Sequence, residues 1–252
     1  MNHKSRPRLQ IVACADREPV ASYLISGFRA FRASCARYGF DPIILGWGRP
    51  WRGLGSKPKL LKSAIDDGIV TSDHILFMDA FDTWFADSPD EILRVFTENW
   101  QSRIVWNAER ACFPDASLAQ YFDDAGTPYR YLNSGMSIGE TDAYMECLRE
   151  MDVDGWPDDY KDASGTWHHR NDQDDWMRRF LFGQCPGQVR MSLDNGCRLF
   201  QTLTGVEPDE FTFHADGRIE NRITRSFPMA FHANGGSKTG GMMERTITHL
   251  GL

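Results

Sequence analysis

Two aspartates, Asp79 and Asp82, follow directly on the apolar residues 75–78 in the stretch HILFMDAFDTWFAD. An ionised carboxylate is costly to bury without a partner, so a hydrophobic strand that ends on two acids needs an explanation. A tight turn can fold back so that both side chains face one point. Oxygen ligands of this kind suit Mg²⁺ or Mn²⁺, usually shared with substrate phosphates. The residues alone leave open a metal site and a turn that Asp82 caps while Asp79 is solvated.

A phosphatase is a rival explanation for these acids. Phosphatases of the haloacid dehalogenase type also end an apolar strand on acids, in the pattern DxDxT. Here Ala80 and Phe81 separate Asp79 from Asp82, so the second acid comes one position too late to be that general acid. The phosphatase is therefore the less favoured hypothesis.

The composition is that of an ordinary globular protein and excludes some partners. The chain has 252 residues, of which 41% are hydrophobic and 25% are charged, which is enough for one sizeable α/β domain. Its formal net charge of −7 argues against a nucleic-acid partner, because sequence-independent binding needs a basic surface. An anionic substrate would need local positive charge or a metal.

The location of the protein is predicted from signals that the sequence does not show. The N-terminal residues MNHKSRPRLQ are basic but have no apolar core of signal-peptide length behind them. No apolar run approaches the roughly 18 residues of a membrane span. The six cysteines are scattered without a CxxC pair, which is typical of reduced thiols: Cys14, Cys35, Cys112, Cys147, Cys185 and Cys197. We expect a cytoplasmic protein with no membrane partner.

The elements that position the acids alternate between strand and helix in the first half of the chain. The patterns predict strands over 9–15, 41–47, 74–79 and 103–109, and helices over 20–38, 57–67 and 88–96. The last of these helices has a strong start, because Ser88 can cap it and Pro89 occupies its first position. Such alternation predicts a mainly parallel, doubly wound sheet, in which ligands bind beyond the carboxyl ends of the strands.

The second half of the chain is less regular. Residues 131–140 are predicted to form a strand that leads into a helix over 141–150, and residues 171–182 have a helical pattern. Residues 156–170 are predicted to be a loop. Short strand-like pieces follow at 188–193, 197–203, 210–214 and 218–223. Without a linker or repeat, one domain is the economical interpretation.

Seven segments, in this order along the chain, carry a resemblance to a known family: GWGRPWRGLGSKPKLLKSAI, ILFMDAFDTWFA, VWNAERACFP, YLNSGMSIG, NDQD, LDNGCRLFQTLTG and FHANGGSKTG. Together they resemble the glycosyltransferase domain of the procollagen lysyl hydroxylases and, more loosely, the procollagen galactosyltransferases. The resemblance implies a single GT-A domain over 1–252, a Rossmann-like nucleotide-sugar-binding fold whose mainly parallel mixed sheet is flanked by helices. Residues 8–110 would form the nucleotide-binding half, and residues 111–252 the half that holds the sugar and acceptor.

The resemblance also implies a divalent metal, Mn²⁺ or Mg²⁺, that holds the diphosphate of a UDP-sugar. Asp79 and Asp82 match the metal-binding acids of the family, and His232 matches its third metal ligand. An imidazole ligand favours Mn²⁺ over Mg²⁺. Glycines beside this histidine, Gly235 among them, let backbone approach a diphosphate, and Lys238 would meet a phosphate oxygen.

Three further residues match nucleotide-binding positions of the family. Trp51 matches a tryptophan that lies on the nucleotide, and Lys57 matches a lysine near the diphosphate. Phe81 stands where the lysyl hydroxylases have a tyrosine that packs on the uracil, so it keeps the ring and loses the hydroxyl. Core packing for Phe81, an ordinary loop position for Trp51 and a solvated helix start for Lys57 are the bland alternatives.

Asp172 matches an acid that the family needs for transfer. It would hold the sugar hydroxyls or the reacting centre, or act as a base for the acceptor hydroxyl. Asn133 and Ser134 offer hydrogen bonds to a sugar, and Gly135 permits close approach.

Four other acids stand near these segments. Glu109 and Asp194 are further candidates for the sugar pocket, with structural capping as the equal alternative. Asp174 and Asp175 are interpreted as a solvated helix face, because the family has apolar residues at those places.

The implied reaction is transfer of glucose or galactose from a UDP-sugar to an acceptor hydroxyl, with UDP-glucose the first hypothesis. The acceptor is open between a protein hydroxylysine, a glycan and a small molecule. A module that binds a nucleotide sugar without turnover is the main alternative, and the presence of Asp79, Asp82, His232 and Asp172 together argues against it. The oligomeric state is not predicted.

Overall fold

A computed structural model describes residues 8–183 and 188–252. It is built around a six-stranded mixed sheet. The strands follow one another in the order β2 (Ile43–Leu45), β1 (Leu9–Cys14), β3 (His74–Asp79), β6 (Tyr131–Glu140), β5 (Ile104–Glu109) and β9 (Met191–Leu193). Only β6 runs against its neighbours, since it pairs antiparallel with both β3 and β5 while the other pairings are parallel. The predicted single α/β domain with a mainly parallel sheet is confirmed.

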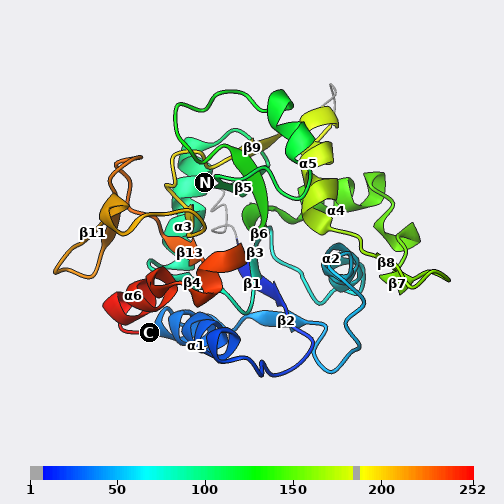
Figure 1. Cartoon of the computed structure of the whole chain (residues 1–252), viewed down its shortest axis with the longest axis horizontal. Coiled ribbons are helices and arrows are strands. Elements are labelled where there is room, and N and C mark those ends of the chain that lie inside the picture. Colours follow the sequence, from blue (N-terminus) through cyan, green and yellow to red (C-terminus); the bar gives the residue numbers. More distant parts are fainter. Residues whose placement is uncertain (1–7, 184–187) are drawn as a thin grey trace, which may run out of the picture.

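Helices cover both faces of this sheet (Figure 1). On one face α1 (Ser22–Arg37) and α3 (Pro89–Asn99) pack against side chains such as Leu76 and Met78. On the other face α2 (Ser56–Asp66), α4 (Thr141–Glu150) and α5 (Asp172–Phe182) pack against alternate residues such as Ile75 and Phe77. Strands buried on both faces are apolar throughout, which is why residues 75–78 carry no polar alternation.

Ser88 and Pro89 start α3 as the sequence predicted. The Ser88 hydroxyl accepts a hydrogen bond from the Glu91 backbone N–H at 3.1 Å, and Pro89 is the first helical residue. The cap satisfies one of the donors that a helix start leaves unpaired. The helix therefore begins where the sequence places it, ten residues after the end of β3.

A second, three-stranded sheet completes the site region. It has the order β10 (Phe200–Thr202), β13 (Ala230–His232) and β4 (Thr83–Phe85). A two-stranded sheet of β11 (Phe211–Phe213) and β12 (Ile219–Asn221) lies beyond it, and α6 (Gly241–Leu250) closes the fold. Within the described residues, four 3₁₀ turns join elements that follow one another along the chain: η1 (Ala116–Tyr121), η2 (Val153–Gly155), η3 (Pro208–Glu210) and η4 (Gly235–Thr239). The four strand-like pieces predicted for this half contain β9, β10, β11 and β12.

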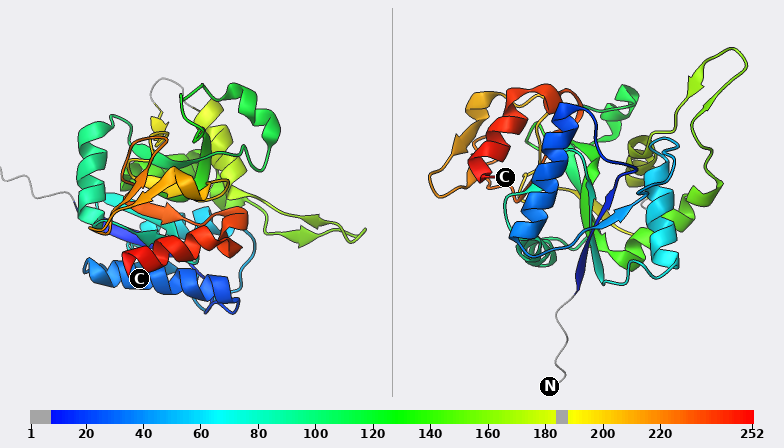
Figure 2. Two further views of the ribbon diagram at one scale, coloured as in Figure 1. Left: turned by 60° about the vertical axis from the view of Figure 1, so that its left-hand side comes forward. Right: turned by 90° about the horizontal axis from the view of Figure 1, so that it is seen from below.

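The predicted loop over 156–170 contains one short hairpin that was not predicted and is otherwise irregular. This segment is an arm that projects from the body of the domain (Figure 2) and contains the hairpin of β7 (Tyr160–Lys161) and β8 (Trp167–His168). Its turn is held by the Asp162 carboxylate, which accepts hydrogen bonds from the backbone N–H groups of Ser164 and Thr166. The strands are only two residues long and carry no apolar alternation, so periodicity could not reveal them.

Two other expectations concern cysteines and membranes. Five cysteines are free thiols in the structure: Cys14, Cys35, Cys112, Cys147 and Cys197. The sixth, Cys185, lies outside the described residues. Within the described parts of the chain, no helix has both the length and the apolar character that crossing a membrane requires.

Candidate functional site

Ten residues predicted for the metal, the nucleotide and the transfer step line two adjoining cavities beyond the carboxyl ends of the central strands: Trp51, Lys57, Asp79, Phe81, Asp82, Asn133, Asp172, His232, Gly235 and Lys238. One cavity has a volume of about 420 Å³ and the other of about 330 Å³. Five residues border both of them: Leu54, Lys57, Asp79, Asp82 and Lys238. The two cavities therefore meet at the acid pair, in the position where open α/β sheets bind ligands.

The three predicted metal ligands come together at this meeting point. One ligand atom from each of Asp79, Asp82 and His232 lies within 4.8 Å of the other two. Strand pairing explains how distant residues meet, because β13 runs antiparallel to β4 with His232 opposite Thr83. The Asp82 carbonyl also accepts a hydrogen bond from the Ala233 N–H at 2.8 Å. The pairing register thus places the imidazole beside the second acid.

The hydrogen bonds of His232 fit a metal ligand. Its Nδ1 lies 2.9 Å from the Asn133 Oδ1, an oxygen that also accepts from the Gly135 N–H at 3.0 Å. An amide oxygen only accepts, so Nδ1 carries the proton and donates it. Nε2 is therefore the ring atom that faces the Asp82 carboxylate, at 3.4 Å, and it is the nitrogen that would bind a cation.

A cation bound at this point would contact both the imidazole nitrogen and the carboxylate. Fixing the tautomer through the other ring nitrogen is the usual support of a metal-ligating histidine. The donor set of two carboxylates and one imidazole therefore fits Mn²⁺ or a similar divalent cation.

Gly135 makes room for the histidine ring, which the sequence did not predict. A Cβ added at Gly135 would lie 2.0 Å from Cε1 of His232.

The Gly135→Ala variant is expected to displace the imidazole, because a Cβ at this distance overlaps the ring. We expect a loss of stability of about 1–3 kcal/mol and a loss of Mn²⁺ affinity of about 10-fold or more. Thermal unfolding and calorimetric titration with Mn²⁺ measure the two effects.

Gly236 provides the matched control for this variant. It lies four residues after His232, and a Cβ built on it meets no atom within 4 Å. Gly236→Ala should bind Mn²⁺ as the wild type does. If Gly135→Ala also bound Mn²⁺ normally, His232 would not be the third ligand.

Two lysines neutralise the acids at the meeting point. The Lys57 ammonium lies 3.1 Å from Asp79 Oδ1 and 3.1 Å from Asp172 Oδ2, and its residue is only 5% exposed. Burial acts to lower the pKa of Lys57, but the charges of Asp172 and Asp79 outweigh it and raise that pKa. Lys57 is therefore a fixed cation that joins the metal-binding acid to the predicted catalytic acid.

Burial and a facing opposite charge also shift the pKa values of Asp172 and Lys238. Burial raises the pKa of Asp172, the charge of Lys57 lowers it, and the net direction is upward. Lys238 lies 2.6 Å from Asp82 Oδ2; burial lowers its pKa, while Asp82 reverses the direction and raises it. Burial likewise opposes ionisation of Asp82, but His232 and Lys238 hold its pKa below the usual range. The two acids thus differ, because burial prevails at Asp172 and the facing positive charges prevail at Asp82.

Glu109 is the centre of an amide network at the base of the larger cavity. Its Oε1 accepts from Asn133 Nδ2 at 3.2 Å and from Gln173 Nε2 at 2.7 Å, and its Oε2 accepts from Asn234 Nδ2 at 2.7 Å. Burial raises the pKa of Glu109, and the hydrogen bonds from Asn133 and Gln173 act against that rise. Every polar group of Asn133 is engaged, so this side chain orients His232 through a bond that the sequence did not indicate.

Gln173 and Asn234 are the polar residues of this network that sequence reasoning missed. Gln173 also accepts from the Ser134 N–H at 3.0 Å, and Asn234 accepts from the Thr204 N–H at 3.1 Å. Both lie directly beside a predicted functional residue, in NDQD and FHANGG. That adjacency was the available signal.

The smaller cavity is aromatic and apolar on one side. Trp51 and Phe81 line it together with Tyr23, and the Phe81 ring is also tilted against Phe28 at a centroid distance of 5.7 Å. Rings of this kind suit a planar base, which stacks on aromatic faces. Asp16 and Arg17, which follow β1, line the same cavity and were not predicted. Their position after the end of a buried strand could have indicated them.

Three other predicted acids lie outside the cavities. Asp194 is a turn cap, since its carboxylate accepts hydrogen bonds from the backbone N–H groups of Arg198, Leu199 and Phe200. The capping alternative for Asp194 is therefore correct and the sugar-pocket alternative is wrong. Asp174 pairs with Arg178 at 2.9 Å, and Asp175 pairs with Arg170 at 2.5 Å. Neither lines a cavity, and the expected solvated helix face is wrong, because both side chains are partly buried in ion pairs.

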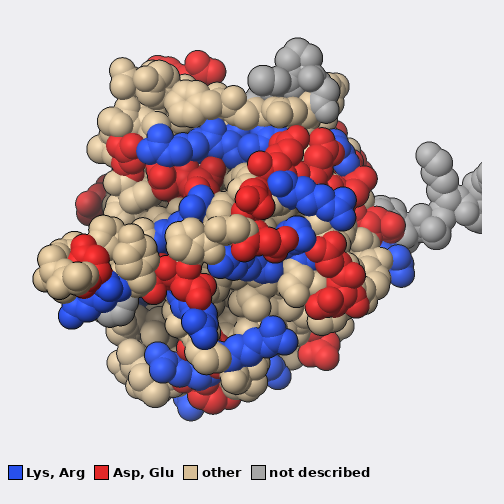
Figure 3. Space-filling view, turned by 90° about the vertical axis from the view of Figure 1, so that its right-hand side faces the viewer, with Lys and Arg blue, Asp and Glu red and all other residues tan. Residues whose placement is uncertain are grey.

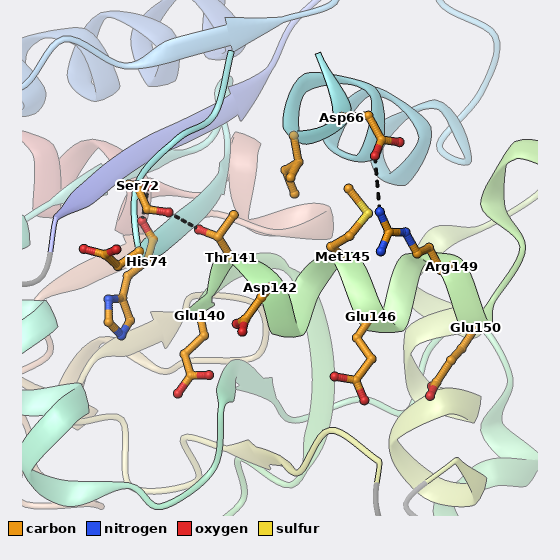
Figure 4. Close-up of a pocket in the computed structure, with 12 residues that line it drawn as sticks. Asp66, Ser72, His74, Glu140, Thr141, Asp142, Met145, Glu146, Arg149 and Glu150 are labelled. Carbon is orange, nitrogen blue, oxygen red and sulfur yellow. Dashed lines mark hydrogen bonds and ion pairs between the residues drawn. The ribbon is translucent and has the colours of Figure 1, made fainter. Parts of the chain in front are cut away.

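A larger and more open groove of about 1010 Å³ lies elsewhere, along α4 and the start of β3 (Figure 4). It is strongly acidic, but its acids are already paired. Arg103 contacts Glu140, Asp142 and Glu146 at 2.6–3.1 Å. Basic and acidic side chains are interspersed over the face of the molecule that Figure 3 shows. Among the described residues, each acid that lines the groove is ion-paired, and no residue of the groove lines either site cavity.

Comparison with known proteins relates this site to a family. The sequence profile described as the PLOD GT domain matches residues 17–243. The multifunctional procollagen lysine hydroxylase and glycosyltransferase LH3 of Rattus norvegicus is 30% identical over 234 residues, which cover 87% of this chain and 29% of that protein. Procollagen-lysine,2-oxoglutarate 5-dioxygenase 1 of Homo sapiens is 30% identical over 229 residues, with 87% and 30% covered. The chain thus spans less than a third of the length of these relatives.

A solved structure supports the fold. The crystal structure of a glycosyltransferase involved in the glycosylation of the major capsid of PBCV-1 aligns with a TM-score of 0.53 and 12% identity, covering 96% of this chain and 99% of that chain. At this identity the likeness concerns the fold alone. The expected GT-A fold is confirmed.

Proposed function

Because this chain belongs to the family of the PLOD GT domain and is a glycosyltransferase domain, we propose that it transfers a hexosyl group from a UDP-sugar to an acceptor hydroxyl with the help of a divalent cation. Glucose is the favoured hexose and galactose the alternative, since the sequence most resembles the glucosyl branch of the family. Mn²⁺ is the favoured cation, with Mg²⁺ second.

One observation carries this proposal: the ligand atoms of Asp79, Asp82 and His232 converge where the two cavities meet. The smaller one is called the aromatic cavity here, after Trp51 and Phe81, and the larger one the polar cavity. A UDP-sugar has the same order of parts, with an aromatic base at one end, a diphosphate in the middle and a polyhydroxylated ring at the other. The aromatic cavity would take the uracil and the polar cavity the hexose. A cation bound between them would supply Lewis-acid stabilisation of the negative charge on the UDP leaving group.

The side chains of this domain have distinct tasks in the proposed reaction. Trp51, Phe81 and Tyr23 would bind and orient the base by stacking. Lys238 is close enough to the acid pair to meet a phosphate oxygen. The side chains of the network around Glu109 are hydrogen-bonded to one another, so they would give the polar cavity a rigid wall against which the hexose lies.

Asp172 is the proposed group at the reacting centre. It lines the polar cavity, and its ion pair with Lys57 holds the carboxylate in one place. A carboxylate there can hold a sugar hydroxyl or accept the proton of the attacking acceptor. The acceptor itself is a hydroxyl compound, and a protein hydroxylysine, a glycan and a small molecule are the three classes to test.

The proposal is tested by incubating the chain with Mn²⁺ and a panel of UDP-sugars and measuring released UDP. A transferase without its acceptor still releases UDP slowly by hydrolysis, so turnover of one UDP-hexose above the others is the expected result. EDTA should stop the release and added Mn²⁺ should restore it, because the acid pair needs the cation to bind the diphosphate.

Two outcomes would replace the proposal with an alternative. Tight binding of UDP with no release from any UDP-sugar, even with hydroxylysine peptides, glycans and small alcohols added, would indicate a binding module without turnover. Hydrolysis of simple phosphomonoesters, with no thermal shift on adding UDP and Mn²⁺, would indicate a phosphatase instead.

A further inference from the structure

The base of the projecting arm, residues 156–170, is fastened to the loop that carries Trp51. This loop, residues 46–55, connects β2 to α2 and borders the aromatic cavity with Trp51 and both cavities with Leu54. The arm ends just before α5, whose first residue is Asp172. Any contact between the arm and the loop therefore links the proposed base-binding side of the site to its reacting centre.

Asp159 makes that contact from three sides. Its backbone N–H donates to the Arg52 carbonyl at 3.0 Å. Its carboxylate accepts from the Arg170 N–H at 3.0 Å and lies 2.8 Å from His169 Nδ1. The carboxylate also occupies the space where Gly53 lacks a side chain, since a Cβ built there would lie 2.2 Å from the Asp159 Cγ. Asp159 thus contacts the loop through its backbone N–H and through the packing of its carboxylate on Gly53, while the same carboxylate bonds the last residues before α5.

Neighbouring contacts strengthen the same junction. The Arg170 guanidinium lies over the Trp156 ring at 3.8 Å from its centroid, and the buried Trp156 accepts from Lys59 through its carbonyl. The backbone of Gly53 has φ +96°, a conformation that favours glycine and lets the loop approach Asp159 this closely. Asp159 is thus packed against Gly53 of the loop on one side, while Arg170 and Trp156 pack together on the other side of the junction.

Asp158 beside it offers a contrast. It pairs with Arg52 at 3.1 Å, but the two side chains are 40% and 62% exposed, whereas the Asp159 side chain is 17% exposed. An exposed ion pair contributes little, while a nearly buried carboxylate with several donors is costly to lose. Asp159 is therefore the residue of this pair on which the junction depends.

We propose that Asp159 is a positioning residue that sets the Trp51 loop against the start of α5, so that the base-binding and reacting parts of the site keep one relative geometry. This inference rests on the proposed binding of a UDP-sugar. It predicts that disturbing Asp159 weakens binding of the nucleotide while leaving the cluster of Asp79, Asp82 and His232 able to bind a cation, because that cluster is held by β3, β4 and β13.

The experiment compares variants in two calorimetric titrations, with Mn²⁺ alone and with UDP at saturating Mn²⁺. Asp159→Ala is expected to weaken UDP binding about 10-fold, with Mn²⁺ affinity changed by less than about twofold. Asp159→Asn should recover most of the UDP affinity, because its amide oxygen can still accept from the Arg170 N–H. Gly53→Ala should weaken UDP binding as Asp159→Ala does, because it disturbs the same contact from the other side.

Asp158→Ala is the matched control and should bind UDP as the wild type does. Wild-type UDP affinity in Asp159→Ala would overturn the inference, and so would an equal loss of Mn²⁺ and UDP affinity, which would show general disruption instead of positioning. A wild-type chain that fails to bind UDP would overturn the proposed function first and this inference with it. The two failures are therefore distinguishable.

Discussion

Replacing Asp82 by alanine should abolish the metal-dependent binding of UDP. Asp82 is 2% exposed, and its carboxylate faces His232 at 3.4 Å and Lys238 at 2.6 Å. Without it, a cation keeps only two protein ligands and loses one of the two carboxylate charges that attract it. We expect Mn²⁺ affinity to fall about 100-fold or more. UDP affinity at fixed Mn²⁺ should fall in parallel, because the cation bridges the protein to the diphosphate.

The measurement is titration of UDP in the presence and absence of Mn²⁺, with the wild type and two variants. Asp82→Asn keeps the shape of the side chain and removes its charge, so it tests whether charge alone causes the loss. Asp87→Ala removes an exposed acid from the same segment and should bind UDP normally. Normal binding of Mn²⁺ and UDP by Asp82→Ala would show that the metal site is assigned to the wrong residues.

Replacing Asp172 by asparagine should spare donor binding and remove turnover. Asp172 is not among the three clustered ligands, but it lines the polar cavity and is held 3.1 Å from Lys57. We expect the rate of UDP release to fall about 10²–10⁴-fold, the range that a positioned acid–base group contributes. Asparagine is preferable to alanine, because its oxygen can still accept from Lys57. Alanine would leave that buried ammonium to Asp79 alone and so disturb a metal ligand.

The control for this variant is Asp174→Asn, two positions further along α5. Asp174 pairs with Arg178 outside both cavities, so its loss should leave the rate unchanged. The measurement is UDP release under single-turnover conditions together with titration of UDP and Mn²⁺. Retained turnover in Asp172→Asn would place the reacting centre elsewhere. A loss of UDP affinity as large as the loss of rate would show that Asp172 serves donor binding instead of transfer.

Much of the fold could be predicted from the sequence because its signals are local. The apolar run of residues 75–78 predicts a strand buried on both faces, and the structure confirms it as the part of β3 that packs against helices on each side. Ser88 and Pro89 mark the start of α3 within a few residues. The hairpin of β7 and β8 escaped prediction, since it is held by a turn at Asp162 and not by an apolar face.

The tertiary structure changed the meaning of several site residues. Gly135, expected to let a sugar approach, is instead the space into which the His232 ring fits. Asn133 was expected to offer hydrogen bonds to a sugar. Its amide is instead hydrogen-bonded to His232, Gly135 and Glu109. The sequence could not reveal either contact, because the His232 ring that both residues touch lies about a hundred residues further along the chain.

By itself, the sequence determined which residue types the site contains and which strand delivers the acid pair. Apolar patterning, caps and the position of Asp79 at the end of a strand act within a few residues of one another, so they can be read along the chain. Only the tertiary structure decided which of these residues share one point. The pairing of β4 with β13 brings His232 to Asp82, and the packing of α2 against the sheet brings Lys57 between Asp79 and Asp172. These contacts join segments that are distant in the chain, and strand register and helix packing set them through the whole folded core.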